Sequence, residues 1–270
     1  MTAEPPRGRV LIIAGSDSSG GAGVQADIKA VTMLGGYAAT AITAVTVQNT
    51  LGVTGVHPIP ADIIRAQADA VLSDIGADAI KTGMLGDAAT VELVADLLAA
   101  HPDIPAVIDP VMVAKGGAAL LTDDAIAAVR ERLIPRADLL TPNTPEAEAL
   151  TGLTIETADD ARRAGERLLA LGARAVLMKG GHLSGETVTD LLLTPDGETL
   201  FEQPRLNTRH THGTGCTLAS ACAAGLAQGL PLAEAVARAW TYTGEAIRRT
   251  PGLGQGHGPL DHGWPLRDVK

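Results

Sequence analysis

Residues 211–216, with the sequence THGTGC, run directly into an alanine-rich stretch that has the composition of a helix. Small residues at Gly213 and Gly215 leave backbone N–H groups accessible around Thr214, and a helix start adds a partial positive charge. The segment therefore predicts a binding site for an oxyanion, such as the terminal phosphate of a nucleotide. A cysteine at a helix start is expected to have a lowered thiol pKa, which would allow Cys216 to take a proton. An ordinary glycine-rich turn with a buried cysteine is the alternative for this segment.

Three oxygen-bearing side chains have the chemistry of a magnesium site. Asn143 and Glu146 are three residues apart at a predicted helix start, so both lie on one face and could orient a hydrated Mg²⁺. The alternative for this pair is purely structural, as a helix N-cap followed by a first-turn acid. Asp109 ends a predicted strand ahead of Pro110, where its carboxylate could help to hold the metal or could simply start a turn.

A positive charge and a set of ring-binding side chains complete the candidate site. Lys179 ends an apolar segment, where a lysine is unusual unless it meets an anion, and we expect it to reach a phosphate. Gln48 offers both a donor and an acceptor, which suits the edge of a heterocycle with an amino group beside a ring nitrogen. A loop-capping glutamine is the alternative. Met84 and Val111 could sandwich a flat ring, although lone apolar residues are more often part of a core.

Two further patterns give weaker indications. The loop GSDSSGGAG at 15–23 lacks the G-x-G-x-x-G spacing of dinucleotide-binding loops, and it fits better as a place where a small substrate approaches the backbone. His210 and His212 alternate on an extended stretch and could face one metal, but no third ligand has compatible spacing for zinc. A cysteine hydrolase built on Cys216 lacks an orienting acid, and Cys222 is expected in the core.

Apolar runs and amphipathic segments alternate along the chain, and these elements must position the candidate site. The alternation predicts an α/β fold with a mostly parallel sheet and helices on both faces, in a single doubly wound domain. Ligands bind such sheets at the carboxyl ends of the strands, where the polar and glycine-rich connectors of this chain fall. The predicted strands are 10–14, 38–47, 79–82, 107–109, 139–140, 175–178, 188–193 and 199–203. The predicted helices are 24–34, 61–74, 88–100, 123–133, a short one after 145, 157–171, 217–228 and 232–249.

The composition argues against nucleic-acid and membrane partners. The 270 residues carry a formal net charge of −10, and a surface that binds polyanions needs a basic patch. No apolar run reaches the roughly 18 residues of a membrane span, and the N-terminal segment has no apolar signal core. Hydrophobic residues make up 46% and aromatic residues only 2%, so the core is expected to be aliphatic. The two cysteines lie six residues apart on one predicted helix, which suits a reducing cytosol and predicts a cytoplasmic protein.

Seven segments, taken together and in this order, resemble the hydroxymethylpyrimidine/phosphomethylpyrimidine kinases of thiamine biosynthesis, within the ribokinase-like superfamily. The resemblance covers residues 9 to 262, nearly the whole chain. The segments are IAGSDSSGGAGVQADIK at 13–29, TAVTVQNT at 43–50, KTGML at 81–85, DPVMVAKGG at 109–117, TPNTPEAE at 141–148, LMKGGH at 177–182 and HGTGC at 212–216.

The resemblance implies a ribokinase-like fold, with a central sheet of about nine strands and a small cover, in a homodimer. It implies ATP and Mg²⁺ as cofactors. The implied reaction is phosphate transfer to the hydroxymethyl group of an aminopyrimidine, followed by a second phosphorylation of the monophosphate.

Residue roles follow from the same motifs. The resemblance implies that Gln48 reads the aminopyrimidine. The residues that would line its pocket are Gly15, Asp27, Met84 and Val111. It also implies that Asn143 and Glu146 orient the metal, that Lys179 contacts phosphate, and that the turn 213–215 forms an anion hole with Thr214 against the nucleotide. Most of the superfamily has aspartate where Cys216 stands, so the cysteine would be the base that accepts the hydroxyl proton.

Two other functions are compatible with parts of this pattern. A pyridoxal kinase would use the same machinery on a flat heterocycle that also carries a hydroxymethyl group, and dual activity is a third possibility. Gln48 favours the aminopyrimidine, because an amide pairs with both a ring nitrogen and an exocyclic amine. A non-catalytic pyrimidine-binding regulator should have lost part of the machinery, yet Lys179, Glu146 and Cys216 are all present.

Overall fold

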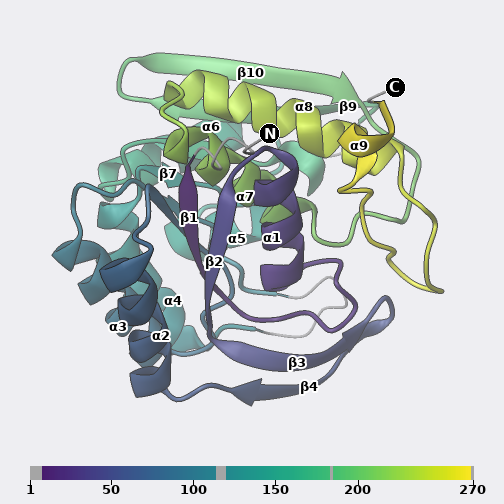
Figure 1. The fold of residues 1–270 in the computed structure, drawn as a ribbon. Coiled ribbons are helices and arrows are strands. Elements are labelled where there is room, and N and C mark those ends of the chain that lie inside the picture. Colours follow the sequence, from purple (N-terminus) through teal and green to yellow (C-terminus); the bar gives the residue numbers. More distant parts are fainter. Residues whose placement is uncertain (1–7, 114–119, 183–184, 269–270) are drawn as a thin grey trace.

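The computed structural model describes residues 8–113, 120–182 and 185–268. Its main feature is an eight-stranded sheet in the order β10-β9-β8-β7-β6-β5-β1-β2 (Figure 1). Neighbours from β2 to β8 pair in parallel, whereas β9 is antiparallel to both of its neighbours. The predicted mostly parallel α/β sheet is confirmed, with eight strands where about nine were expected. The strands are β1 (Arg9–Ala14), β2 (Tyr37–Ile42), β5 (Ala79–Thr82), β6 (Ala106–Ile108), β7 (Leu139–Leu140), β8 (Val176–Met178), β9 (Thr187–Thr194) and β10 (Gly197–Pro204).

Helices cover both faces of this sheet, because successive residues of each buried strand point to opposite sides. In β1, Leu11 and Ile13 belong to one buried core, and Val10 and Ile12 belong to the other. The first core is completed by α2 (Ala61–Asp74), α3 (Ala88–Ala100), α4 (Asp123–Ala128), the π-helical segment Val129–Leu133, α5 (Thr144–Thr151) and α6 (Ala158–Ala170). The second is completed by α1 (Gly23–Met33), α7 (Thr214–Ala227) and α8 (Leu232–Arg248), with α9 (Trp264–Asp268) packed beside it.

A separate two-stranded sheet carries Gln48. Strands β3 (Ala44–Asn49) and β4 (Gly52–Pro58) pair in antiparallel and lie below the central sheet in Figure 1. We call these two strands the ribbon. The prediction of one strand over 38–47 is wrong, because the chain leaves the central sheet at Thr43, whose N–H still donates to Ala14 O at 3.0 Å. The sequence GVTGVHP of β4 has two glycines and a proline, and these residues concealed the strand.

Helix α7 begins at Thr214 rather than near residue 217. Gly213 is its N-cap and has φ = 80°, a left-handed conformation that favours glycine. The hydroxyl of Thr214 donates to Thr211 O at 2.8 Å, and the hydroxyl of Thr217 donates to Gly213 O at 2.8 Å. The predicted anion-binding turn is therefore the first turn of the helix itself, where backbone N–H groups lack intrahelical partners. Among the described helices, none has the length and apolar character needed to cross a bilayer.

Candidate active site

The carboxyl ends of the parallel strands bring three predicted site residues together. Lys179 follows β8, Asp109 follows β6, and Glu146 lies in the first turn of α5. Lys179 Nζ is 2.9 Å from Asp109 Oδ1 and 3.8 Å from Glu146 Oε2. The lysine side chain retains 12% exposure, against 1% for Asp109 and 6% for Glu146. We call these three residues the ion cluster, and its lysine is the member most open to a ligand.

Burial and mutual attraction set the charges in the ion cluster. Burial opposes the charge on Lys179, but the carboxylates of Asp109 and Glu146 outweigh it and raise the pKa of the ammonium. Burial raises the pKa of the Glu146 carboxyl to about 7; Lys179 opposes this rise and the negative charge of Asp109 adds to it. The hydroxyl of Thr141 donates to Asp109 Oδ1 at 3.0 Å. One permanent cation thus faces two carboxyl groups, one of which gains a proton near neutral pH.

Asn143 and Glu146 also cap helix α5. Asn143 Oδ1 accepts from the backbone N–H of Glu146 at 3.0 Å, and Glu146 Oε2 accepts from the backbone N–H of Asn143 at 2.8 Å. This is a capping box, so the structural alternative for the pair is confirmed. The cap also fixes the carboxylate, because Oε2 is the same oxygen that faces Lys179. A role for either residue toward a metal stays a prediction.

The first turn of α7 lies directly beside the ion cluster. A Cβ on Gly215 would be 3.0 Å from Lys179 Nζ and 3.6 Å from Asp109 Oδ2, so only glycine leaves this approach open. A Cβ on Gly213 would be 1.9 Å from Gly21 O, which places the N-cap against the loop after β1. The structure therefore brings the predicted anion-binding turn, the lysine and the acidic residues to one place. Such an arrangement can neutralise and orient a phosphate.

The Cys216 thiol differs from its sequence-based prediction. Burial raises its pKa to about 12, and the carboxylates of Asp27 and Asp109 act in the same direction. Lys81 and a hydrogen bond from the backbone N–H of Gly23 oppose the shift without reversing it. The expectation of a lowered thiol pKa is wrong because enclosure by protein outweighs the helix start. The side chain is half-buried, and the raised pKa favours its thiol form at neutral pH.

A buried ion pair lies among the residues whose charges act on Cys216. Asp27 was predicted to line the substrate pocket, but its carboxylate contacts Lys81 Nζ through both oxygens at 2.9 Å, and both side chains are 0% exposed. Ser220 Oγ donates to Asp27 Oδ1 at 2.7 Å. Ser220 lies four residues after Cys216 on α7, so both side chains are on the same face of the helix. Burial raises the pKa of the Asp27 carboxyl, and the charge of Lys81 and the hydrogen bonds from Ser220 and Lys81 oppose this rise without reversing it.

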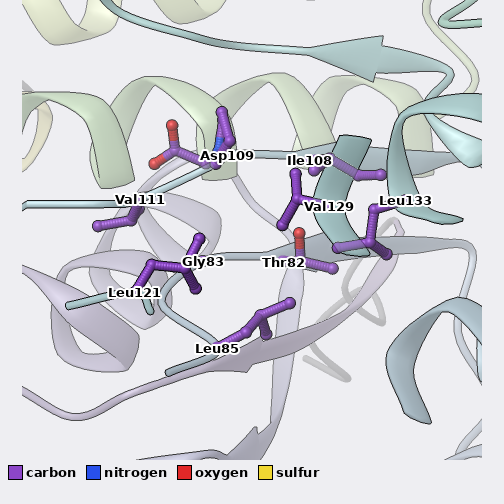
Figure 2. A pocket seen from close by; sticks show the side chains of 10 residues that line it. Thr82, Gly83, Leu85, Ile108, Asp109, Val111, Leu121, Val129 and Leu133 are labelled. Atoms are coloured by element: carbon purple, nitrogen blue, oxygen red, sulfur yellow. The ribbon is translucent and has the colours of Figure 1, made fainter. Parts of the chain in front are cut away.

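Of the residues predicted for the substrate pocket, Gly15 lies against Met84, and Val111 lines a small cavity. A Cβ on Gly15 would be 2.3 Å from Met84 Cε, so this glycine makes room for the methionine. Val111 and Asp109 line a small cavity together with Gly83 (Figure 2). The other residues of that cavity are Thr82, Leu85, Ile108, Pro110, Leu121, Val129 and Leu133. Whether Met84 and Val111 hold a ring between them stays a prediction.

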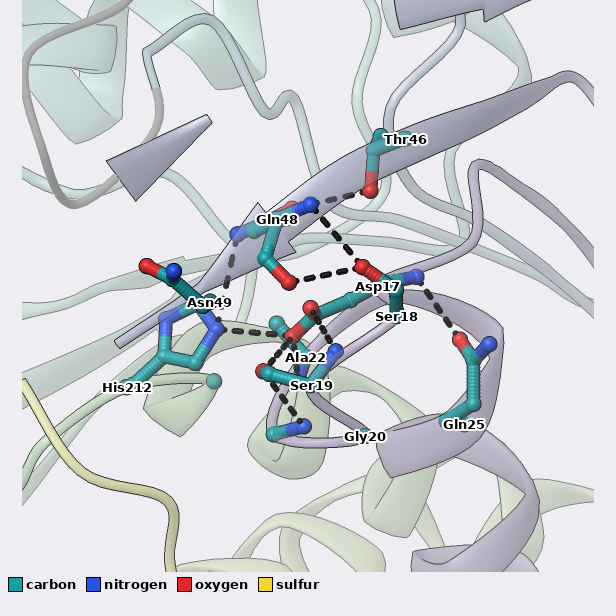
Figure 3. Close-up of polar contacts among 12 residues, drawn as sticks. Asp17, Ser18, Ser19, Gly20, Ala22, Gln25, Thr46, Gln48, Asn49 and His212 are labelled. Carbon is teal, nitrogen blue, oxygen red and sulfur yellow. Dashed lines mark hydrogen bonds and ion pairs between the residues drawn. The ribbon is translucent and has the colours of Figure 1, made fainter. Parts of the chain in front are cut away.

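Gln48 joins a chain of polar contacts that includes two residues not predicted for the site. Its side-chain amide lies 3.4 Å from His212 Nε2, and His212 Nε2 lies 2.7 Å from Asp17 Oδ2 (Figure 3). The backbone of Gln48 exchanges two hydrogen bonds with the Ser18 hydroxyl. His212 thus faces a carboxylate, while His210 Nδ1 accepts from Gly258 N at 3.2 Å. The two histidines have separate partners and do not form the shared metal site considered from the sequence.

The residues that sequence reasoning missed have weak local signals. Lys81 stands in the buried strand AIKT, where a charged residue signals a buried partner. Asp17 lies in the glycine-rich loop after β1, where its carboxylate binds the N–H groups of Ser19 and Ala22. His212 precedes the anion-binding turn. Each partner lies far away in the sequence, so only the fold reveals the pairing.

The donor set of the ion cluster fits magnesium. Mg²⁺ is usually bound through one or two carboxylates, with water and phosphate oxygens in the remaining positions. Asp109 and Glu146 supply such carboxylates beside the predicted phosphate position. Within the described residues, no group of three or more His, Cys, Asp or Glu side chains is placed to hold a metal. Asp109 and Glu146 could therefore supply only part of the ligand shell of a metal.

Comparison with known proteins decides the family. The model of the phosphomethylpyrimidine kinases matches residues 17–261. The chain belongs to this family. It is 49% identical to the hydroxymethylpyrimidine/phosphomethylpyrimidine kinase of Bacillus subtilis over 94% of each chain. It is 51% identical to a thiamine biosynthesis bifunctional protein of Geobacter sulfurreducens, covering 98% of this chain but only 54% of that protein.

A solved structure extends the likeness to the fold. The crystal structure of an ADP complex of B. subtilis pyridoxal kinase has a TM-score of 0.90 and 39% sequence identity, and the match covers 97% of this chain and 99% of that one. The predicted ribokinase-like fold is confirmed by this neighbour. As a member of the phosphomethylpyrimidine kinase family, the chain is a phosphotransferase.

Proposed function

We propose that this kinase transfers the γ-phosphate of ATP to the hydroxymethyl group of 4-amino-5-hydroxymethyl-2-methylpyrimidine, and then phosphorylates the monophosphate to the pyrophosphate used in thiamine biosynthesis. The family and the names of the relatives support the reaction and the substrate. The ADP bound to the pyridoxal kinase supports the nucleotide. We further propose that the chain acts as a single-domain, cytoplasmic homodimer. Sedimentation of the purified protein will test whether it is a dimer.

The observation that carries this proposal is the contact between the first turn of α7 and the ion cluster. A phosphate at this helix start would meet backbone N–H groups and Lys179 together, since Gly215 leaves the lysine within 3.0 Å of a Cβ position. Asp109 and Glu146 would hold Mg²⁺, with Asn143 fixing Glu146, and the ion would neutralise charge on the phosphate oxygens. Lys179 would supply a fixed positive charge where negative charge develops during transfer.

Cys216 is assigned to the hydroxyl proton of the substrate. The hydroxyl oxygen bonds to the γ-phosphorus, the bond from that phosphorus to the bridging oxygen of ADP breaks, and the proton passes to the Cys216 thiolate. Phosphoryl transfer has a loose transition state, so positioning and charge stabilisation matter more than a strong base. Because the thiol pKa is about 12 in the unliganded protein, the thiolate is scarce at neutral pH, and kcat should rise with pH.

Substitution of the two cysteines tests this assignment. Cys216→Ala should lower kcat by about 10²- to 10⁴-fold, the usual contribution of a positioned base. ADP binding, measured by calorimetry, should be largely retained because the thiol does not contact the nucleotide in this proposal. Cys222→Ala, at a fully buried position on the same helix, is the matched control and should keep near-normal turnover. Near-normal turnover of Cys216→Ala would assign the proton to another acceptor.

Pyridoxal phosphorylation is the second candidate, because a pyridoxal kinase shares the fold with a TM-score of 0.90. The higher identity to the pyrimidine kinase of the same organism, 49% against 39%, favours the pyrimidine. Steady-state rates with the two heterocycles at equal concentrations, with ATP, will separate the two activities. A failure to form ADP with either heterocycle would favour a non-catalytic pyrimidine-binding protein.

A further inference from the structure

The Asp17 carboxylate fixes the position of one hydrogen on His212. Asp17 is 1% exposed and accepts from the Ser19 backbone N–H at 2.8 Å, the Ser19 hydroxyl at 2.8 Å and the Ala22 backbone N–H at 2.7 Å. Burial opposes ionisation, but the hydrogen bonds from His212 and Ser19 outweigh it and lower the pKa of Asp17 to about 2. An ionised carboxylate only accepts. His212 Nε2, at 2.7 Å from Asp17 Oδ2, must therefore carry a hydrogen, in the neutral ring and in the imidazolium alike.

This hydrogen determines which end of the Gln48 amide faces His212. The amide has one accepting oxygen and one donating NH₂, and a half-turn about its last bond exchanges them. The atom 3.4 Å from His212 Nε2 stands as the amide nitrogen, which would set two donors against each other. The single Nε2 hydrogen goes chiefly to Asp17, and an amide oxygen at this position can share it as a second, weaker acceptor, whereas an NH₂ group cannot.

The other end of the amide gives the same answer independently. The Thr46 hydroxyl donates its single hydrogen to Ser16 O at 2.8 Å. Thr46 Oγ1 can then only accept from the Gln48 atom that lies 3.3 Å away. That atom must be the NH₂ group. Both neighbours thus require Oε1 toward His212 and Nε2 toward Thr46, the reverse of the amide drawn in Figure 3, where the nitrogen faces His212.

We propose that Asp17 and His212 are positioning residues that lock the Gln48 amide and thereby make the site select an amino over an oxo substituent on the heterocycle. The inference rests on the proposed function, in which Gln48 faces the ring. Oε1 shares the Nε2 hydrogen of His212 with Asp17, and one N–H of the amide is held by Thr46, so the amide keeps one free N–H and one free lone pair. The free N–H can donate to a ring nitrogen, and the free lone pair of Oε1 can accept from an amino group beside that nitrogen. A 4-oxo ring, with a ring N–H and a carbonyl, has the opposite order and meets donor against donor.

Without the His212 side chain, the site should lose its preference for the amino over the oxo heterocycle. The readout is the ratio of kcat/KM for 4-amino-5-hydroxymethyl-2-methylpyrimidine to kcat/KM for its 4-oxo counterpart. His212→Phe should lower this ratio by about 10- to 100-fold, because the freed amide can turn to suit either ring. His212→Gln should restore much of the ratio, since its NH₂ has one hydrogen for Asp17 and one for Gln48. His210→Phe, two residues away and without a contact to the Gln48 amide, is the matched control and should leave the ratio unchanged.

Two results would overturn the proposal. The first is an equal loss for both substrates in His212→Phe, with the ratio intact, which would make His212 merely structural. The second is nuclear magnetic resonance of the wild-type imidazole that finds Nε2 without a hydrogen. The resonance measurement needs no substrate, so it tests the lock even if neither pyrimidine is phosphorylated, an outcome that would refute the proposed function instead. Circular dichroism of each variant establishes that it is folded.

Discussion

Two lysines near the carboxyl ends of the parallel strands meet their carboxylates in different ways. Lys81, in β5, is fully enclosed and contacts both oxygens of Asp27 at 2.9 Å. Lys179, after β8, keeps 12% exposure and faces Asp109 at 2.9 Å and Glu146 at 3.8 Å. Both side chains are long cations at one edge of the same sheet.

The difference lies in how completely each lysine is partnered. Lys81 has a carboxylate devoted to it, with Ser220 completing the hydrogen bonds of that carboxylate. Its removal would leave a buried charge alone, which is costly for the fold. Lys179 divides its charge between two acids and lies beside the open start of α7, so a phosphate can bind next to its ammonium group. We infer that the Asp27–Lys81 pair, the closed pair, chiefly serves the structure around Cys216, whereas the ion cluster serves phosphate transfer.

The largest expected effect comes from removing the open lysine. Lys179→Met should lower kcat by about 10²- to 10³-fold, because it removes a charge aimed at the developing transition state. Thermal unfolding should also move to lower temperature, because Asp109 is left buried without its ion pair, so kcat is compared at a temperature where both proteins are folded. Lys29→Met is the control: this exposed lysine contacts only the Gly20 carbonyl, at 2.7 Å, among the bonds described here. A kcat within twofold of wild type in Lys179→Met would show that Lys179 does not serve phosphate transfer.

Substitutions in the closed pair, Lys81 and Asp27, should change the free energy of unfolding rather than kcat. Lys81→Met is expected to lower the free energy of unfolding by about 3–5 kcal/mol, because Asp27 is left buried without its partner. The double variant Asp27→Asn/Lys81→Met should recover much of this loss, since neither buried charge remains. Urea unfolding of both variants gives the two values. Equal destabilisation in the single and double variants would mean that packing, and not the ion pair, explains the effect.

A further effect is expected from pH on the Cys216 thiol, whose pKa depends on charges in both the ion cluster and the Asp27–Lys81 pair. Only the thiolate reacts with iodoacetamide, and burial raises the pKa of Cys216 to about 12. The rate of alkylation should therefore increase about tenfold per pH unit from about pH 7 to about pH 10, without a plateau. The Cys222→Ala background isolates the signal. A plateau within this range would place the thiol pKa there and return Cys216 to the activated state that the sequence suggested.

The sequence predicted the parts of the site that depend on strand order. Asp109 and Lys179 each follow a buried strand, and parallel strands bring their carboxyl ends to one edge, so their meeting follows from the alternation of elements. The Asn143–Glu146 capping box is equally local, since three residues separate its members. These features need only short-range patterns and one rule of topology.

The rest depended on contacts between distant segments. Lys81 and Asp27 are 54 residues apart, and Asp17 and His212 are 195 residues apart, so no local pattern pairs them. The thiol pKa of Cys216 depends on enclosure, which a sequence motif does not measure. The ribbon escaped prediction because residues 38–47 form one continuous run of small and β-branched residues, and nothing in that run marks Thr43 as the point where the chain leaves the central sheet.

The ribbon has a consequence for how this enzyme can diversify. Gln48 stands on β3, outside the central sheet, whereas Lys179, Asp109 and Cys216 are anchored to the sheet and to α7. On the proposed role of Gln48, substitutions along the ribbon would change which heterocycle binds, while the residues proposed for phosphate transfer keep their places on the sheet and α7.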